Sequence, residues 1–347
     1  MVLLAGAPTP TGGRSLRGFR TFPNAAADIV GSHNSPPEGG DDARGGDVER
    51  EIDGEAGTPG VREPRARQGH VLTGLVGRGI QKSRSPAMHE AAGRHCGLAL
   101  EYRLLDVDRM GPPTPSLGAI LDRAEAEGFA GVNVTHPYKQ EVLRHLGRIS
   151  DSARAVGAVN TVVFGDGERI GHNTDSWGFR EAFRAELGDA RRDTVVLLGA
   201  GGGGAAVSHA LMETGVGRLL VIDPEPDRAA ALVAKLDAQF GGGRVVVAAN
   251  LAGAIAAADG VINATPVGMD SHPGSPVPDD LVRPSMWVAD IVYFPIETEL
   301  LRTARAKGCR TMGGGHMAIL QAARAFEHFT GLTADVETMR AAFLAAG

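Results

Sequence analysis

Three short strings between residues 131 and 175 gather hydrogen-bonding side chains around one lysine and one aspartate. They read GVNVTHPYK at 131–139, GAVNT at 157–161 and GHNTD at 171–175. A lysine amine beside a carboxylate can accept or relay a proton, and amides and hydroxyls suit a ligand with several hydroxyl groups. The strings therefore predict a polyol site in which Lys139 and Asp175 form the acid–base pair, with a plain surface ion pair as the alternative.

A glycine-rich turn follows an apolar run at 195–198 and contains Gly199, Gly201 and Gly204. In a G-x-G-x-x-G turn the first glycine permits the tight turn, the second lets the backbone approach a pyrophosphate, and the third lets helix and strand pack closely. A second apolar strand ends at Asp223, and 223 minus 199 gives 24, near the offset of about 20 at which an acid takes the adenosine ribose hydroxyls. An anion there repels a 2'-phosphate, so the turn favours NAD over NADP. The alternative is a simple turn with Asp223 as a helix cap.

Composition narrows the class of protein. The 347 residues are 43% hydrophobic, which predicts two domains of ordinary size. The net charge is -6 and no basic block stands apart, so a nucleic-acid partner is not expected. Apolar runs fall short of the roughly 20 residues that span a bilayer, so no membrane segment is expected. Only Cys96 and Cys309 occur, far apart, which argues against a disulfide framework and favours a reducing, cytoplasmic compartment.

Three histidines lie inside or beside the motif strings, at 136, 172 and 316. They lack a paired-ligand spacing such as His-x-x-x-His, so no metal site is predicted. Residues 1–68 differ from the rest because Gly, Pro, Arg, Asp and Glu dominate them. Such a composition buries too little apolar surface to offset chain entropy, which predicts a disordered leader.

From Val71 onward the pattern alternates between strands and helices. The first series predicts strands at 71–77, 100–107 and 130–134, with helices at 86–96 and 118–128. The second predicts strands at 194–198, 218–222, 244–248, 260–263 and 286–291, with helices at 204–215, 227–238 and 251–258. Alternating units imply parallel sheets covered by helices, an α/β fold. We expect a substrate-binding catalytic domain at 69–176, a Rossmann dinucleotide-binding domain at 177–314, and C-terminal helices at 315–347, including one at about 316–329, that pack back on the catalytic domain.

These strings, in this order, resemble those of the shikimate and quinate dehydrogenases. The resemblance covers about residues 70–345 and is carried by SRSP at 83–86, NVTHPYK at 133–139, GAVNT at 157–161, NTD at 173–175, NATPVGM at 263–269 and DIVY at 290–293. The chain is most similar to the NAD-dependent quinate/shikimate dehydrogenases of actinobacterial type, because Asp223 stands where NADP-dependent members carry a turn that binds the 2'-phosphate.

The resemblance implies roles for individual residues of the substrate site. Ser83 and Ser85 would bind the substrate carboxylate, Tyr293 would lie near both carboxylate and nicotinamide, and Lys139 with Asp175 would handle the proton. Amides and hydroxyls would bind ring hydroxyls or one another: Asn133, Thr135, Asn160 and Gln321. The alternatives are purely structural roles. Either serine could cap a helix, the amides could stabilise turns, and Tyr293 could be a core aromatic.

On the cofactor side, the resemblance implies a set of contacts along the second series of elements. The turn glycines Gly199 and Gly201 precede Gly202 and Gly203, which would touch the pyrophosphate. Asp223 would bind the ribose, and Arg228 the adenine side, unless it is a solvated helix residue. The nicotinamide ribose would be lined by Thr265, Pro266, Val267 and Gly268, and the nicotinamide would be flanked by Val292 and Gly314.

The implied reaction is NAD-dependent oxidation of quinate, shikimate or both to the 3-dehydro acid, with hydride passing to nicotinamide C4. Quinate-using relatives often carry Thr at position 85, so Ser85 favours shikimate, whereas Asp223 favours the dual-use subgroup. The alternatives are an NADP-dependent biosynthetic shikimate dehydrogenase and an aminoshikimate-type dehydrogenase. A non-catalytic sensor is disfavoured because Lys139 and Asp175 are both present. The expected partner is a small polyol carboxylate, and the chain is expected to be a monomer or a homodimer.

Overall fold

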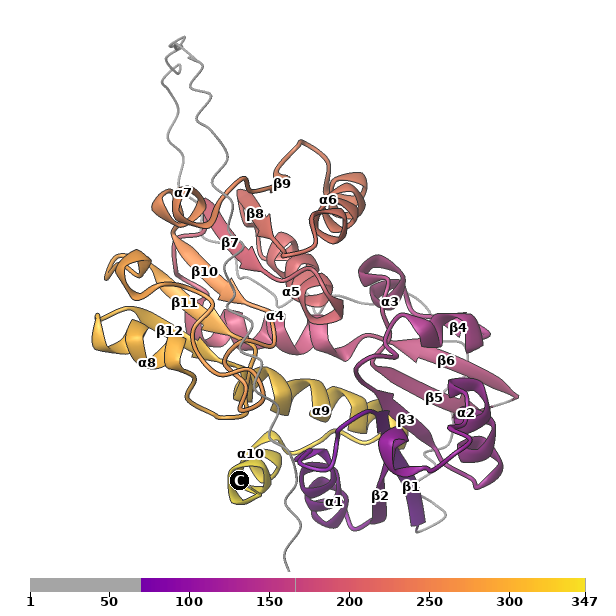
Figure 1. The fold of residues 1–347 in the computed structure, drawn as a ribbon. Coiled ribbons are helices and arrows are strands. Elements are labelled where there is room, and N and C mark those ends of the chain that lie inside the picture. Colours follow the sequence, from indigo (N-terminus) through magenta and orange to yellow (C-terminus); the bar gives the residue numbers. More distant parts are fainter. Residues whose placement is uncertain (1–69, 166, 347) are drawn as a thin grey trace, which may run out of the picture. The chain divides into compact units, whose positions relative to one another are not determined.

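The computed structural model describes residues 70–165 and 167–346, so the leader predicted at 1–68 lies outside the described residues. Two six-stranded sheets follow one another along this part of the chain, with helices around both (Figure 1). The predicted α/β fold is confirmed. Among the described helices, none combines the length and the apolar character that a bilayer span requires.

The first sheet is mixed, not purely parallel as predicted. Its order is β2-β1-β3-β5-β6-β4, and β5 runs antiparallel to both β3 and β6. Only positions 166 and 167 separate β5 from β6, and so short a connection can join antiparallel strands only. The strands are β1 (His70–Gly77), β2 (Ala99–Asp106), β3 (Gly131–Val134), β4 (Arg148–Ile149), β5 (Thr161–Gly165) and β6 (Glu168–His172).

Short helices flank this sheet, and local sequence explains where they start. Pro86 occupies the first turn of α1 (Ser85–His95), where its missing N–H costs nothing. Ser116 caps α2 (Leu117–Ala126) and Ser150 caps α3 (Asp151–Val156), each accepting a backbone N–H three residues on. The 3-10 turns η2 (Val107–Arg109) and η3 (Glu141–His145) complete this half.

The second sheet is fully parallel, in the order β12-β11-β10-β7-β8-β9. Chain order reverses between β7 and β10, and in such sheets ligands bind in the crevice at the carboxyl ends beside this reversal. The predicted Rossmann arrangement is therefore confirmed. Its strands are β7 (Thr194–Leu198), β8 (Arg218–Ile222), β9 (Val245–Val247), β10 (Gly260–Asn263), β11 (Trp287–Asp290) and β12 (Arg310–Gly313). Its helices are α5 (Gly202–Glu213), α6 (Pro226–Phe240), α7 (Leu251–Ala256), η4 (Asp279–Leu281) and α8 (Glu299–Ala306).

Two long helices, α4 (Thr174–Leu187) and α9 (Gly314–Thr330), pack on each other between the sheets. Gly178 allows the approach, because a Cβ there would lie 2.8 Å from the backbone nitrogen of Gln321. The domain boundary predicted at 176/177 falls inside α4, and the boundaries themselves stay predictions.

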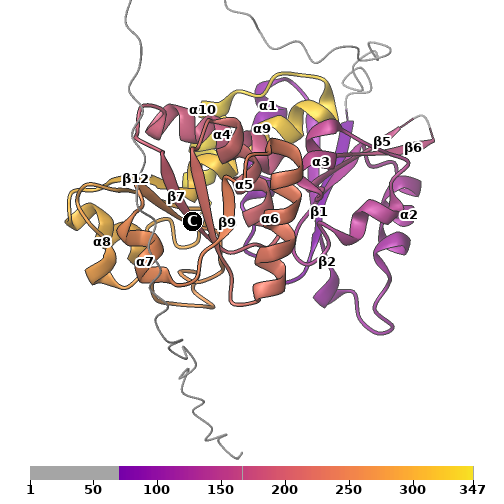
Figure 2. The ribbon, with the colours of Figure 1, turned by 90° about the horizontal axis from the view of Figure 1, so that it is seen from above.

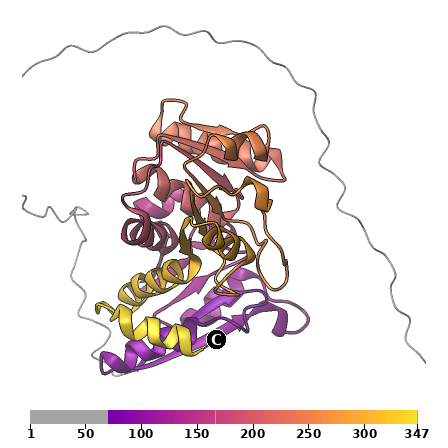
Figure 3. The same cartoon turned by 90° about the vertical axis from the view of Figure 1, so that its left-hand side faces the viewer.

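The final helices return to the first sheet, as predicted. Phe326 and Phe329 of α9 and Phe343 of α10 (Val336–Ala345) share one core cluster with Val71 and Met88. Figure 2 shows α10 close to α1, and Figure 3 shows the yellow C-terminal helices beside the purple first sheet. This return brings α9 residues to the carboxyl ends of the first sheet's strands.

Candidate active site

Lys139 and Asp175 meet at the carboxyl end of the first sheet. Lys139 lies in the turn after β3, and its Nζ is 2.6 Å from Asp175 Oδ2 in the first turn of α4. Asn173 caps that helix and so fixes where Asp175 points. The two side chains are 22% and 10% exposed, so the pair is shielded but open to a ligand on one side. The structure thus brings together the predicted acid–base pair.

The pair also lies against the glycine turn. A Cβ added to Gly202, at the start of α5, would lie 3.5 Å from Lys139 Cδ. The apolar stem of the lysine therefore packs on the first turn of the helix that the sequence assigns to pyrophosphate binding. One side chain thus contacts both predicted halves of the site.

Asn133 is held in a single orientation by buried partners. Its Oδ1 accepts a hydrogen bond from the Tyr102 hydroxyl at 2.8 Å, and its Nδ2 donates to Thr161 Oγ1 at 3.0 Å. Burial raises the pKa of Tyr102, and a hydrogen bond with Ser85 opposes this rise. The Tyr102 hydroxyl therefore stays protonated and donates to the predicted substrate residue Asn133.

Asn160 continues the network toward α9. Its Nδ2 donates to Thr174 Oγ1 at 2.9 Å and to Gln321 Oε1 at 3.5 Å. Its Oδ1 accepts the backbone N–H of Thr174 at 2.8 Å. The three predicted amides thus belong to one hydrogen-bond network: Asn133, Asn160 and Gln321. This agrees with the expectation that they could bond to one another. Their contacts to ring hydroxyls stay predictions.

The serine loop is tied to its surroundings on both sides. Ser83 Oγ accepts the backbone N–H of Ser85 at 3.2 Å, while the N-cap position of α1 is Arg84 and not Ser85. Asp106 at the end of β2 accepts from Gly79 N at 3.2 Å and from Gln81 Nε2 at 2.9 Å. The loop that presents both serines is therefore anchored by a buried carboxylate.

Arg84 links this loop to the C-terminal helix. It is only 5% exposed and donates to the carbonyl of Phe343 at 3.0 Å. Its guanidinium lies 4.7 Å from the Phe343 ring centre and 5.6 Å from that of Phe294.

Tyr293 is 37% exposed, which argues against its role as a core aromatic. Thr135 directly follows β3, with its methyl group against Gly77.

The glycine turn has the geometry that its motif requires. Gly199 has a φ of 96°, a left-handed conformation that favours glycine. A Cβ on Gly204 would collide with the Gly199 carbonyl, so the third glycine is required for close packing. Gly201 is the N-cap of α5, and Gly202 and Gly203 form its first turn, where free backbone N–H groups attract anions.

Asp223 is anchored to this turn. Its Oδ2 accepts the backbone N–H of Ala200 at 2.7 Å, and its Oδ1 accepts that of Glu225 at 2.8 Å. Glu225, not Asp223, is the N-cap residue of α6. Arg228 donates to Glu225 Oε1 at 2.6 Å, and its Nη1 lies 3.8 Å from Asp223 Oδ1. Two carboxylates, those of Asp223 and Glu225, therefore lie near Arg228 beside the predicted ribose position.

The loop after β10 is shaped by Asn263. Its Oδ1 accepts from Thr265 N at 3.0 Å and Thr265 Oγ1 at 2.6 Å, and its Nδ2 donates to Val267 O at 2.8 Å. Pro266 lies inside this turn, and Gly268 closes it with a φ of 107°. Val292 is buried, and a Cβ on Gly314 would collide with the carbonyl of Ile291. The predicted nicotinamide residues thus lie in the loops after β10 and β11 and at the start of α9.

Sequence reasoning missed several members of the site. Four of them lie inside the motif strings quoted above: Thr161, Thr174, Asn263 and Asp290. Their presence in these strings is a signal by which they could have been predicted. Tyr102 stands alone on β2 with no motif around it. Its role becomes visible only when β1 brings β2 and β3 into one sheet.

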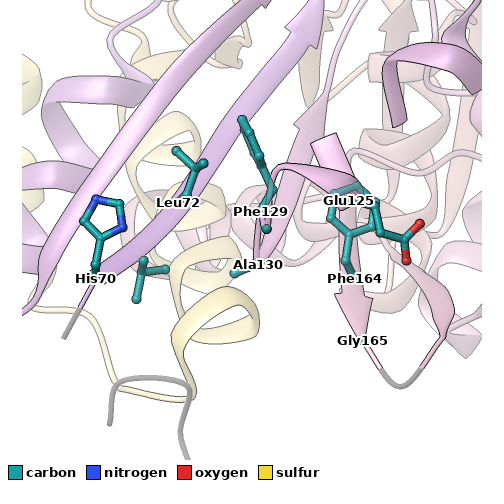
Figure 4. Close-up of a pocket in the computed structure, with 9 residues that line it drawn as sticks. His70, Leu72, Glu125, Phe129, Ala130, Phe164 and Gly165 are labelled. Atoms are coloured by element: carbon teal, nitrogen blue, oxygen red, sulfur yellow. The ribbon is translucent and has the colours of Figure 1, made fainter. Parts of the chain in front are cut away.

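A cavity of about 320 Å³ lies elsewhere, lined by residues that include His70, Leu72, Phe129, Ala130 and Phe164 (Figure 4). These residues are at the beginning of β1 and β3 and near the end of the antiparallel β5. The cavity is therefore at the opposite edge of the sheet from Lys139 and is not part of this site.

Two of the three motif histidines, His172 and His316, have protein partners for their rings. His172 stacks on His328 with ring centres 3.9 Å apart, and His316 Nδ1 is 2.6 Å from Glu186 Oε1. Within residues 70–165 and 167–346, no group of three or more His, Cys, Asp or Glu side chains is arranged to hold a metal ion.

Comparison with known proteins gives consistent matches. Residues 75–162 match the shikimate dehydrogenase substrate binding domain, and residues 316–342 match the shikimate 5'-dehydrogenase C-terminal domain. A quinate/shikimate dehydrogenase (NAD(+)) of Corynebacterium efficiens is 50% identical over 277 residues, 79% of this chain and 98% of that protein. A shikimate dehydrogenase (NADP(+)) of Streptomyces avermitilis is 50% identical over 276 residues, 79% of this chain and 95% of that protein.

Among solved structures, the quinate dehydrogenase of Corynebacterium glutamicum in complex with NAD matches with a TM-score of 0.76 and 47% identity. The match covers 80% of this chain and 99% of that one. The similarity thus extends over both sheets and the final helices.

Proposed function

The chain belongs to the shikimate dehydrogenase family, and from this premise we propose that it oxidises quinate, shikimate or both with NAD+ as hydride acceptor. The observation that carries the proposal is the Lys139–Asp175 pair, at 2.6 Å, with its lysine stem packed on the glycine turn. A proton-handling pair and a dinucleotide cradle at one place suit an alcohol dehydrogenase.

The residues of the cradle fit a dinucleotide. Side chains at Gly199 or Gly204 would strain or block the turn, which leaves bare backbone for a pyrophosphate. When bound, NAD+ supplies the carbon that accepts the hydride. The protein's own task is to place the substrate and to take its proton.

Proton transfer falls to Lys139. As the substrate's ring carbon gives up hydride, its hydroxyl loses a proton to the Lys139 amine at Nζ. Asp175 accepts a hydrogen bond from Nζ and stabilises the ammonium group that forms. The amide network of Asn133, Asn160 and Gln321 holds the ring hydroxyls, and Ser83 with Ser85 receives the carboxylate.

The NAD preference follows from charge at the ribose edge. Asp223 and Glu225 both lie at the end of β8, and a 2'-phosphate there meets two carboxylates. Arg228 supports a second candidate, NADP-dependent shikimate reduction, because it is the cation nearest Asp223 among the described residues. Arg228 is paired with Glu225, however, and this pairing favours NAD.

Initial rates measured by nicotinamide absorbance, crossing quinate and shikimate with NAD+ and NADP+, test the proposal. We expect turnover of at least one polyol with strong NAD+ preference. NADP+ preference with shikimate alone would replace it by the second candidate. No turnover in any of the four combinations would contradict both candidate functions and would favour an amino-substituted substrate.

The partner that this function requires is a small polyol carboxylate. The cytoplasmic location, the choice between monomer and homodimer, and the domain limits at 69–176, 177–314 and 315–347 stay predictions. Size-exclusion chromatography with light scattering decides the assembly state.

A further inference from the structure

Asp290, the last residue of β11, has a carboxylate buried beneath the nicotinamide side of the predicted cofactor site. It has 0% exposure, and three donors converge on it. Oδ1 accepts from Asn263 Nδ2 at 2.9 Å and from Val292 N at 3.0 Å, and Oδ2 accepts from Thr298 Oγ1 at 2.7 Å. Burial raises the pKa of Asp290 to about 6, against the effect of these hydrogen bonds.

Through Asn263, the carboxylate controls the loop at 264–269. Asn263 uses its amide to shape the turn that contains Thr265 and Val267. The amide oxygen can accept from Thr265, and the amide nitrogen can donate to Val267, in only one orientation of the side chain. The hydrogen bond from Nδ2 to Asp290 Oδ1 fixes that orientation. Gly268 lies near the same carboxylate, since a Cβ added there would be 3.7 Å from Asp290 Oδ2.

Through its other two donors, the carboxylate controls the loop at 291–298. Val292 N begins this loop, and Thr298 ends it. Thr298 Oγ1 also accepts the backbone N–H of Leu301 at 3.3 Å, which makes it the N-cap of α8. One carboxylate therefore holds both ends of the loop that carries Val292 and Tyr293.

We propose that Asp290 is a positioning residue for the nicotinamide end of the cofactor, acting through the two loops that it joins without touching the cofactor itself. The proposal rests on the NAD-dependent function proposed above. A carboxylate that served only the stability of the sheet would bond to its strand neighbours alone. Asn263 is such a neighbour, paired with Asp290 across β10 and β11, but its amide also shapes the loop at 264–269. The other two donors, Val292 N and Thr298 Oγ1, belong to the loop at 291–298, which is also predicted to line the nicotinamide.

The test is a fluorescence titration of NADH with the full chain, measured well below the melting temperature of each variant. Asp290→Ala removes every acceptor, and we expect its Kd for NADH to rise about tenfold or more, as for loss of one or two buried hydrogen bonds. Asp290→Asn keeps Oδ1 for Asn263 and Val292 and offers an N–H to Thr298, so we expect rescue to within about threefold of the unaltered chain.

Val288→Ala is the matched control, because Val288 is fully buried on the same strand but belongs to an apolar cluster. We expect it to lower the melting temperature and leave the Kd for NADH unchanged. Thr298→Val removes one of the three donors together with the N-cap bond to Leu301 N. It gives a second measurement if Asp290→Ala does not fold, with an expected rise in the Kd for NADH of about threefold.

Two results would overturn the proposal. Equal Kd values for NADH in Asp290→Ala and Val288→Ala would show that Asp290 is only a structural residue, and they would leave the proposed function intact. If Asp290→Ala does not fold, an unchanged Kd for NADH in Thr298→Val would lead to the same conclusion about Asp290. Failure of the unaltered chain to bind NADH would remove the proposed function and this inference together.

Discussion

Asp223 Oδ2 lies 2.7 Å from the backbone nitrogen of Ala200, so the acid at the end of β8 is hydrogen-bonded to the glycine turn after β7. Its side chain is only 3% exposed. In the proposed function, a charge so placed would act twice, because it would oppose a 2'-phosphate and also holds the turn that is predicted to receive the pyrophosphate. We therefore predict that cofactor choice and cofactor binding are coupled through this carboxylate.

Asparagine and alanine at position 223 should therefore behave differently. Asp223→Asn keeps an acceptor for Ala200 N but loses the charge, so we expect kcat/KM for NAD+ to fall about tenfold while that for NADP+ rises. Asp223→Ala loses the anchor too, and we expect it to weaken both cofactors. Steady-state kinetics with each cofactor decide this. A clean switch to NADP+ in the alanine variant would contradict the anchoring role.

Glu225 should act as a second barrier to NADP+, because it engages Arg228 at 2.6 Å. Glu225→Ala frees the arginine for a 2'-phosphate. Since the pair is exposed, we expect a modest rise of about three- to fivefold in kcat/KM for NADP+, with little change for NAD+. The double variant Glu225→Ala/Arg228→Ala should lose that gain. If the double variant keeps it, removal of negative charge alone explains the effect.

Local pattern was sufficient for the buried parallel strands. The predicted bounds 194–198, 218–222 and 260–263 agree with β7, β8 and β10, because strands buried on both faces are continuous apolar runs. The sequence pattern provided no assignment for α3, α4, α8, β4, β5, β6 or β12, and no bounds for α10 within the C-terminal helices predicted at 315–347. The two-residue β4 has no pattern of its own, and the direction of β5 depends on its hairpin with β6.

The site divides in the same way. Lys139, Asp175 and the glycine turn lie in continuous strings, so spacing alone predicts them. Tyr102 and Thr298 contribute through partners 31 and 8 residues away, Asn133 and Asp290. The first partnership exists only after β1 has paired with both β2 and β3, and no one-dimensional pattern contains that information.

Lys139→Met should abolish most turnover while sparing the fold. Methionine keeps an apolar stem against Gly202 but cannot take a proton, so we expect kcat to fall by about 10²- to 10⁴-fold with the Kd for the polyol changed much less. Asp175→Asn should lower kcat less. Lys307→Met, at the C-cap of α8, is the charge-matched control and should keep full activity. Near-normal kcat in Lys139→Met would remove the lysine from the mechanism.

His89 should make the protein sensitive to acid. It is fully buried, and among the described residues neither ring nitrogen has a hydrogen-bond partner. Burial lowers its pKa to about 3, so the unfolded chain binds a proton that the folded chain does not. The stability due to the neutral ring is present above pH 6.5 and is lost as the pH falls toward 3, on the order of 2 kcal/mol by pH 5.

His89→Leu therefore should flatten the acid limb of the stability curve. Leucine has a similar volume and removes two unsatisfied nitrogens beside Tyr102, whose ring centre is 4.6 Å away. We expect the loss in free energy of unfolding between pH 7.5 and 5, measured by urea denaturation, to shrink by about 2 kcal/mol. His172 and His328, whose pKa values burial lowers to about 4 and 3, should maintain the remaining slope. His95→Gln, exposed on the same helix, is the control, and an equal change in both variants would show that buried His89 is not the cause.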